Sequence, residues 1–516
     1  MRVEQFLRDS ARRLPDKVAV VAGRDRLSYG DLDRMSDRLA AGMLGRGVSR
    51  GDRVVIFTDN CWEAVVSIFA VLKAGATFVP VNPSTKAEKL AFILENCRAT
   101  AIVTQGRLAT IAARAMIAAP SVDFVVLIGG KGPATAGSLG FEETVAGDHM
   151  PALPPPGITL DLAMLVYTSG STGFPKGVMM THQNVVAAAG SITTYLDSRE
   201  EDVILNLLPI SFDYGLYQVL MTAMVGATLV LEKSFAYPQA ILNRMSEEKV
   251  TGLPLVPTMA AILLQMRDLA PGSFPHLRYL TNTAAALPPT HIMQLQVLFP
   301  FTRIYSMYGL TECKRCTYLP PEDLAEHPDS VGIAIPGTEA YVADEEGRPV
   351  APGIVGELHI RGPHVMRGYW ENPDATDRAL RPGPYPWEKV LRTGDFFRAD
   401  EEGFLYFIGR RDDIIKTRGE KVAPKEVETA LYGLAGIAEA AVVGVPDPVL
   451  GHAIKAVVAL SPGSQITEKD VLRHCAANLE DFMVPKMVEF RDSLPKTDSG
   501  KISRRLIEEE VMEAAE

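Results

Sequence analysis

The 516-residue sequence predicts an α/β fold with a large N-terminal domain and a small C-terminal α+β domain. The chain is too long for one ordinary domain and suggests about two to four. Residues 1–130 and 203–308 alternate apolar strands with amphipathic helices, which indicates mostly parallel sheets covered by helices. After residue 308, short strands separated by turns predict a small β-barrel-like unit.

The first 130 residues show the clearest alternation. Apolar, β-branched runs predict strands at residues 54–57, 77–81, 101–104 and 122–128. Between them, apolar residues at helical spacing predict helices at residues 61–74 and around 90–94. Residues 129–160 are rich in Gly, Pro and Ala, so we expect a long loop or a connection between subdomains there.

The last third of the chain has a different pattern. The short strands of the β-barrel-like unit are predicted at residues 339–344, 355–362 and 403–409. The C-terminal domain has predicted helices at 425–434 and 468–479 and predicted strands at 439–445 and 453–460. We therefore divide the chain into residues 1–408 and 414–516, joined by the charged segment Gly409–Asp413.

Composition and charge exclude several classes of protein. Hydrophobic residues make up 47% and charged residues 22% of the chain, which is ordinary for a globular protein. A formal net charge of −11 argues against a general nucleic-acid-binding role. Met1–Gln5 lacks the apolar core of a signal peptide, and no apolar run reaches the ~18 residues that suggest a membrane span. We expect a cytoplasmic location.

The five cysteines are too few, and odd in number, for a disulfide framework, and they argue for a reducing compartment. Cys313 and Cys316 form an isolated Cys-x-x-Cys pair. No second pair and no ligand histidine lies near them in the sequence. We therefore expect neither a zinc site nor a redox site at this pair.

The most informative segment runs from Tyr167 to Val178 and reads Tyr-Thr-Ser-Gly-Ser-Thr-Gly-Phe-Pro-Lys-Gly-Val. It follows an apolar run, so we expect a strand that opens into a loop rich in glycine and hydroxyl groups. Such a loop exposes backbone N–H groups that can hold a polyphosphate. It is not a Walker loop, because Pro175 and Gly177 flank Lys176 where that motif requires Gly and Ser or Thr.

Four further motifs follow in order: Tyr308–Glu312 (Tyr-Gly-Leu-Thr-Glu), Arg392–Asp395 (Arg-Thr-Gly-Asp), Gly409–Asp412 (Gly-Arg-Arg-Asp) and Pro495–Lys501 (Pro-Lys-Thr-Asp-Ser-Gly-Lys). With these five motifs the chain resembles the adenylate-forming, AMP-dependent ligase superfamily. That superfamily comprises acyl-CoA synthetases, peptide-synthetase adenylation domains and luciferases. The resemblance extends from about Leu27 to Arg504, which is nearly the whole chain.

The resemblance implies three catalytic residues. Lys501 would be the cation placed between a carboxylate and the α-phosphate of ATP. Thr311 would donate a hydrogen bond to that phosphate, and Glu312 would be a ligand of Mg²⁺, which prefers oxygen donors. Lys501 lies in the C-terminal domain, which the resemblance implies is mobile, with Asp412 as the hinge for its rotation.

The resemblance also implies a nucleotide site. Tyr308 would stack on adenine, and Asp395 and Arg410 would bind the ribose hydroxyls. The phosphates would be bound by Thr168, Ser169, Gly170, Ser171, Thr172, Gly173 and Lys176.

The implied acid pocket comprises Phe212, Asp213, Tyr214, Asn282, Met307 and Gly309. The segment from Asn282 departs from the Gly-Gly pattern common in the superfamily, and Phe212 stands where many members have a gating histidine. Asp213 has two interpretations. It resembles the aspartate of amino-acid adenylation domains, whose charge pairs with the substrate ammonium. It also resembles an aspartate of fatty-acyl-AMP ligases that need not contact the substrate, so the sequence does not identify the acid.

The implied activity is that of an ATP-dependent, AMP-forming ligase that makes an acyl-adenylate and passes the acyl group to a thiol. We expect CoA as the acceptor; residues 416–421 resemble the segment that lines the pantetheine tunnel. One alternative is a free-standing amino-acid-activating enzyme that loads the phosphopantetheine of a carrier protein in trans. Another is a non-catalytic nucleotide-binding relative, against which the retention of Lys501, Glu312 and Asp395 argues.

Overall fold

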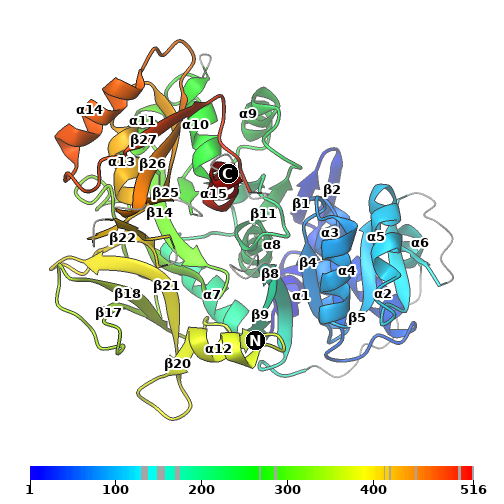
Figure 1. Cartoon of the computed structure of the whole chain (residues 1–516). Helices are drawn as coiled ribbons and strands as arrows, with labels where there is room; N and C mark the ends of the chain where they lie inside the picture. Colours follow the sequence, from blue (N-terminus) through cyan, green and yellow to red (C-terminus); the bar gives the residue numbers. More distant parts are fainter. Residues whose placement is uncertain are drawn as a thin grey trace.

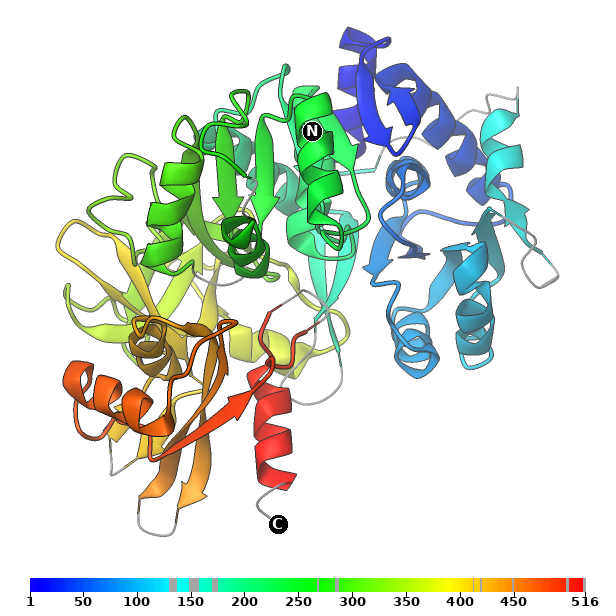
Figure 2. The ribbon, with the colours of Figure 1, turned by 90° about the horizontal axis from the view of Figure 1, so that it is seen from above.

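Figure 1 shows the computed structural model of the chain. The structure describes residues 1–129, 137–147, 157–168, 175–266, 269–283, 287–411, 413–417, 420–447, 450–497 and 501–513. The C-terminal segment, orange to red in Figures 1 and 2, lies beside the green and yellow segments and away from the blue N-terminal segment. Among the described helices, none is long and apolar enough to cross a bilayer.

The first sheet is mostly parallel and provides much of the site. Its strand order is β16 (Ile333–Ala334), β15 (Lys314–Tyr318), β14 (Arg303–Leu310), β13 (Tyr279–Asn282), β12 (Gly252–Leu255), β10 (Val203–Asn206), β11 (Thr228–Leu231), β1 (Val18–Ala22) and β2 (Asp25–Ser28). The strands from β14 to β1 are parallel, and antiparallel strands close both edges.

The second sheet contains the N-terminal alternation. Its order is β19 (Gly368–Tyr369), β9 (Lys176–Thr181), β8 (Leu162–Thr168), β4 (Thr77–Val81), β3 (Arg53–Phe57), β5 (Ala99–Gln105), β6 (Phe124–Ile128) and β7 (Leu139–Gly140). Strands β3 and β4 are buried along almost their whole length, which explains their continuous apolar sequence.

Helices cover both sheets. They are α1 (Glu4–Arg13), α2 (Tyr29–Leu44), α3 (Trp62–Lys73), α4 (Ala87–Asn96), α5 (Ala109–Met116), α6 (Phe141–Ala146), α7 (His182–Tyr195), α8 (Asp213–Val225), α9 (Pro238–Glu247), α10 (Pro257–Gln265) and α11 (Pro289–Leu298), with a short 3₁₀ turn at Gly106–Leu108. Helix α3 is apolar on nearly all sides because it contacts β1 of the first sheet as well as β3 and β4 of the second.

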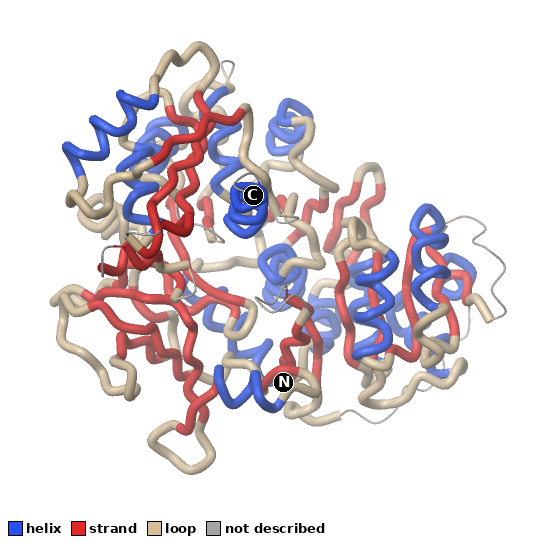
Figure 3. The backbone as a smooth tube through the Cα atoms, in the orientation of Figure 1, coloured by secondary structure: helices blue, strands red, loops and turns tan. Residues whose placement is uncertain are grey.

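The third sheet is antiparallel. It contains β17 (Glu339–Ala343), β18 (Val355–Arg361), β21 (Lys389–Ala399) and β20 (Leu380–Pro382) in that order, and β22 (Leu405–Arg410) also pairs with β21. Figure 3 shows mainly strands and loops in this part of the molecule, with α12 (Pro373–Ala379) at its edge. The predicted β-barrel-like unit is thus an antiparallel sheet whose described strand order is open.

The C-terminal segment has a sheet and apolar clusters of its own. The sheet order is β24 (Glu420–Val422), β23 (Ile415–Thr417), β26 (Gly451–Leu460) and β25 (Ile437–Asp447), with β27 (Met487–Arg491) paired to β26. Helices α13 (Pro424–Tyr432), α14 (Glu468–Asn478) and α15 (Arg504–Glu513) accompany it. Its buried side chains, from Ile415 to Val511, form clusters separate from the main core.

The structure confirms the predicted fold class, and it differs from the sequence prediction at residues 129–160. Within the described residues 137–147, the expected loop contains strand β7 and helix α6. Phe141 begins this helix, is fully buried and packs edge-on against Trp62, with 5.7 Å between the ring centres. The segment is rich in Gly, Pro and Ala, which is typical of loops, so its composition did not predict the short helix that begins at Phe141.

Candidate active site

Several predicted site residues follow strands of the first sheet. β10 leads to Phe212 and Asp213 at the start of α8, β13 ends at Asn282, and β14 leads to the turn of Thr311 and Glu312. Since parallel strands β10, β13 and β14 end at one edge of the sheet, residues far apart in the sequence meet there.

Asp395 lies in a polar network suited to the ribose of a nucleotide. Its carboxylate accepts a 2.6 Å hydrogen bond from the Tyr308 hydroxyl, and its other oxygen lies 3.6 Å from the Arg410 guanidinium. Asp395 and Arg410 face each other across β21 and β22. Burial raises the pKa of Asp395, and Arg410 and Tyr308 partly oppose that rise. The Arg410 side chain is 64% exposed, so donors remain for a ligand.

Glu312, Tyr369 and Lys176 converge beside this network. The Tyr369 hydroxyl donates a 2.7 Å hydrogen bond to one Glu312 carboxylate oxygen, and the Lys176 ammonium lies 5.6 Å from the Tyr369 ring centre. A carboxylate offers two oxygens, and the Tyr369 bond engages only one of them. An oxygen ligand beside the predicted phosphate-binding lysine fits the coordination preference of Mg²⁺.

The predicted phosphate loop joins β8 to β9 as an antiparallel hairpin. Thr168, the last residue of β8, pairs with Lys176, the first residue of β9. Strand β19 pairs with β9 and brings Tyr369 to the same hairpin. The predicted phosphate ligands Ser169, Gly170, Ser171, Thr172 and Gly173, and the predicted hinge residue Asp412, lie outside the described residues.

Lys501 lies at the site although it belongs to the C-terminal segment. Its ammonium is 5.8 Å from the centre of the Phe212 ring. Burial lowers the pKa of Lys501; the carboxylates of Asp213 and Asp395 oppose this shift, and the Arg410 guanidinium adds to it. The predicted catalytic lysine therefore lies near residues of the predicted ribose site and of the predicted pocket for the acid substrate.

The predicted pocket residues Tyr214, Asn282 and Met307 are buried among structural contacts. The Tyr214 hydroxyl donates a 2.7 Å hydrogen bond to the Thr281 carbonyl oxygen. The Met307 sulfur lies 2.9 Å from the Tyr195 hydroxyl, and Asn282 is buried at the end of β13. Contact of these three side chains with the acid stays a prediction.

Gly309 has a clear steric role in the hairpin of β14 and β15. A Cβ atom at this position would lie 1.8 Å from the backbone carbonyl oxygen of Lys314. Lys314 itself has a φ of +65°, which places it in the left-handed region. Only glycine allows the two strands to approach this closely, and the turn between them carries Thr311 and Glu312.

Sequence reasoning missed two buried cations beside the site. Lys314 is 3% exposed, and its ammonium has no hydrogen-bond partner among the described residues. It lies 6.0 Å from the Tyr217 ring centre, and the Arg315 guanidinium lies 4.8 Å from that of Tyr214. Burial lowers the pKa of Lys314, and Asp213 opposes the shift. Their sequence signal is a Lys-Arg pair between two cysteines.

Tyr369, the hydrogen-bond partner of Glu312, was also missed.

Comparison with known proteins decides the family. A family model described as AMP-binding enzyme matches residues 7–370, and one described as the AMP-binding enzyme C-terminal domain matches residues 426–501. The chain is a member of the AMP-binding enzyme family. The resemblance to the adenylate-forming superfamily is therefore confirmed.

Relatives of this AMP-binding enzyme are acid–CoA ligases. It is 33% identical to the long-chain-fatty-acid–CoA ligase of Bacillus subtilis, over 98% of this chain and 94% of the relative. It is 34% identical to a feruloyl-CoA synthase of Amycolatopsis, over 95% of each chain.

Solved structures agree over the whole chain. ATP-bound MatB from Rhodopseudomonas palustris has a TM-score of 0.90 and 29% identity, with 100% of both chains covered. The apo form of MatB gives a TM-score of 0.80 at the same coverage. The anthranilate CoA ligase AuaEII in complex with anthranoyl-AMP gives 0.91 with 25% identity, covering 100% of this chain and 98% of that one.

This AMP-binding enzyme is an ATP- and Mg²⁺-dependent, AMP-forming acid–thiol ligase, and CoA as the thiol fits the ligases that it resembles. The activity and cofactors expected from the motifs are thereby confirmed. The roles of individual residues, the domain boundaries and the hinge stay predictions.

Proposed function

We propose that the enzyme joins ATP and a carboxylic acid without an α-amino group into an acyl-adenylate, releases pyrophosphate, and then transfers the acyl group to CoA. The position of Lys501 carries this proposal. Its ammonium lies against Phe212 and interacts with Asp395 and Arg410 of the predicted ribose site. A cation there neutralises charge between an incoming carboxylate and the α-phosphate.

The charges around Asp213 favour a plain acid over an amino acid. Asp213 interacts electrostatically with two lysines of the protein, Lys501 and Lys314. These ammonium groups compensate the aspartate, so a substrate ammonium is not needed for that purpose. An α-ammonium group beside Asp213 would be repelled by these two lysines and by Arg315, which interacts with Lys314.

In the proposed first step, the acid carboxylate attacks the α-phosphorus and pyrophosphate leaves. Catalysis then consists mainly of positioning and charge neutralisation. Asp395 accepts hydrogen bonds from the ribose hydroxyls, Arg410 donates to the same sugar, and Lys501 holds the carboxylate against the phosphate. Mg²⁺, when bound at Glu312, supplies positive charge to the phosphates.

In the proposed second step, the C-terminal domain rotates about Asp412 and exposes the adenylate to the thiol. Beside the hinge, Arg504 of α15 donates a 2.9 Å hydrogen bond to Asp413 and also pairs with Glu428. These bonds tie the linker to the C-terminal domain, so the two would move together. A carrier protein as the acceptor is a second candidate on sequence grounds.

The ammonium of Lys314 bears on the choice of acid. It is buried, and no described group accepts a hydrogen bond from it. An unsatisfied buried donor is unfavourable by about 1–3 kcal/mol, which an acceptor on the substrate would recover. We therefore expect acids with an oxygen substituent, such as hydroxy or dicarboxylic acids, to be activated better than alkyl acids of equal length.

The test is ATP–pyrophosphate exchange with matched panels of alkyl, aromatic, oxygen-substituted and amino acids, followed by mass spectrometry of thioesters formed with CoA. We expect exchange with plain acids and a matching acyl-CoA product. The Lys314→Met variant should lose the preference for oxygen-substituted acids, whereas Lys469→Met on the surface helix α14 should keep it. Exchange driven by amino acids alone, without a CoA product, would contradict the proposal.

A further inference from the structure

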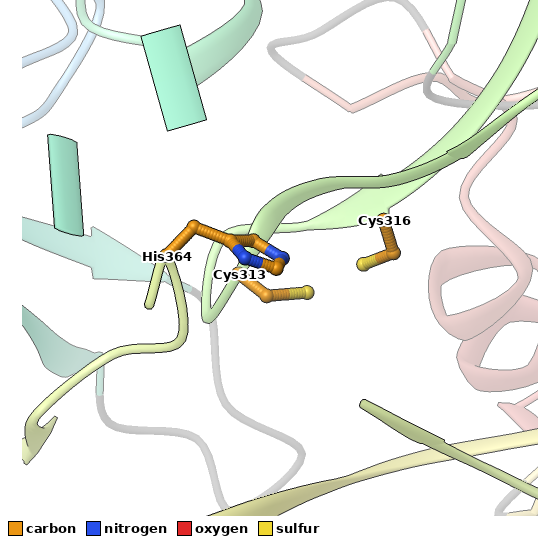
Figure 4. Close-up of side chains that lie close together, drawn as sticks. All are labelled: Cys313, Cys316 and His364. Atoms are coloured by element: carbon orange, nitrogen blue, oxygen red, sulfur yellow. The ribbon is translucent and has the colours of Figure 1, made fainter. Parts of the chain in front are cut away.

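Cys313, Cys316 and His364 form a buried cluster that the ligase reaction does not use (Figure 4). Cys313 lies in the turn between β14 and β15, Cys316 in β15, and His364 in the segment between β18 and β19. Both cysteines are 0% exposed and His364 is 2% exposed. The absence of a ligand histidine near the pair in the sequence gave the expectation of no metal site, and the fold overturns that reason.

The geometry of the cluster is close to that of a metal site. One ligand atom from each residue lies within 4.8 Å of the other two. Zn–S bonds of about 2.3 Å and Zn–N bonds of about 2.0 Å place tetrahedral ligand atoms about 3.5–3.8 Å apart. Each separation therefore exceeds that of a closed site by at most about 1 Å, which small changes of the side-chain torsion angles can remove.

The histidine provides the second observation. Its Nδ1 lies 3.3 Å from the Thr338 hydroxyl, while its Nε2 is buried without a hydrogen-bond partner in the described part of the chain. Figure 4 shows a ring nitrogen on the side of the imidazole that faces the two sulfur atoms. A hydroxyl on one nitrogen and a free second nitrogen is the arrangement of a metal-bound histidine with an outer hydrogen bond.

The segment of His364 is held in place from two sides. Asn184, at the start of α7, donates hydrogen bonds of 2.7 and 2.9 Å to the carbonyl oxygens of Pro363 and Val365. A Cβ on Gly362 would lie 2.7 Å from the imidazole, so only glycine leaves room for the ring there. The ring position is thus determined by its surroundings and does not depend on an ion.

We propose that Cys313, Cys316 and His364 bind one thiophilic cation, with Zn²⁺ as the expected ion. Two thiolates and a neutral imidazole around Zn²⁺ have no net charge, which suits a buried site, and sulfur and imidazole ligands disfavour Mg²⁺. On binding, the two thiol protons leave to solvent. No fourth His, Cys, Asp or Glu joins the group in the described ranges, so a water would complete a tetrahedron.

The site would brace the active-site turn. Cys313 directly follows Glu312, and the Met366 N–H, two residues after His364, donates a 2.7 Å hydrogen bond to the Glu312 carbonyl oxygen. A metal bridging the two segments would fix the backbone that carries the predicted Mg²⁺ ligand. Its role is structural and separate from the proposed adenylation chemistry.

The first test is the metal content of the full chain, expressed with added zinc, purified under reducing conditions and measured by mass spectrometry. We expect about one zinc per chain in the wild type, because the three residues form a single site that binds one ion. The His364→Gln and Cys316→Ser variants should lose it. Cys475→Ser is the matched control, because Cys475 is equally buried but lies in α14, and this variant should keep the zinc.

The second test uses the wild type alone and so does not depend on variant folding. Cobalt(II) added to the metal-free enzyme should give a thiolate-to-cobalt charge-transfer band and tetrahedral d–d bands, and zinc should remove both. Zinc in the wild type no higher than in Cys316→Ser, with no cobalt bands, would overturn the proposal. The proposal would also be overturned if the thiols of Cys313 and Cys316 could be titrated only after reduction, because the two residues would then form a disulfide.

Discussion

Replacing Asp395 by Asn tests the nucleotide site through a change that keeps side-chain volume. The carboxylate accepts from Tyr308 on one oxygen and faces Arg410 with the other. The amide must place its NH₂ group toward one of these two donors, so one favourable interaction becomes a repulsion. The Asn variant also lacks the negative charge of the carboxylate that would accept a hydrogen bond from a ribose hydroxyl.

The magnitude follows from the bonds lost. A hydrogen bond to a charged group contributes about 1.5–3 kcal/mol, which corresponds to a decrease of about 10- to 160-fold in kcat/KM for ATP. The assay is steady-state pyrophosphate release with ATP varied at saturating acid and CoA. Asp377→Asn on the exposed face of α12 is the control and should leave kcat/KM unchanged. An unchanged kcat/KM for ATP in Asp395→Asn, or a change only in the KM for the acid, would refute the assignment.

Three further predictions follow from the same contacts. Gly309→Ala should lower activity by about 100-fold, because its Cβ displaces the hairpin that carries Glu312 and a displacement of catalytic groups by about 1 Å has an effect of that size. The control Gly190→Ala, whose Cβ would lie 3.7 Å from its nearest neighbour, should stay active. Adenylation should require the protonated ammonium of Lys501, whose pKa burial lowers, so the rate should fall as the pH rises through a midpoint below 10.5. A rate that does not change with pH up to 10.5 would contradict the assignment. Asp213→Asn removes a carboxylate that raises this pKa, so its midpoint in the same pH profile should move to lower pH; an unmoved midpoint would show that the two groups do not interact.

Much of the fold was predictable because strand and helix patterns are local properties of the sequence. The continuous apolar runs of β3 and β4 and the helical spacing within α3 indicate buried strands and a covering helix from the sequence alone. Helix α6 was not predicted, because one buried aromatic, Phe141, anchors a segment whose composition is typical of loops.

The site was predictable where motifs carry it and unpredictable where tertiary contacts do. Glu312 and Asp395 were named from motifs, but Tyr369, which donates to Glu312, lies outside them. Lys314 and Arg315 have no role in the motifs and lie beside the site because β15 packs against the tyrosines of α8. The approach of His364 to the cysteine pair arises from three segments that only the tertiary fold brings together.

The most direct measurement compares the two half-reactions in Lys501→Ala. A unit charge about 4 Å from another contributes roughly 4 kcal/mol at an effective dielectric of 20, or about 10³-fold in rate. ATP–pyrophosphate exchange should therefore fall by about that factor, while thioester formation from a supplied acyl-adenylate and CoA should continue near the wild-type rate. Lys496→Ala, on the same segment but paired with Glu439, should retain both. An equal loss of both half-reactions in Lys501→Ala would contradict the placement of this ammonium at the adenylation step.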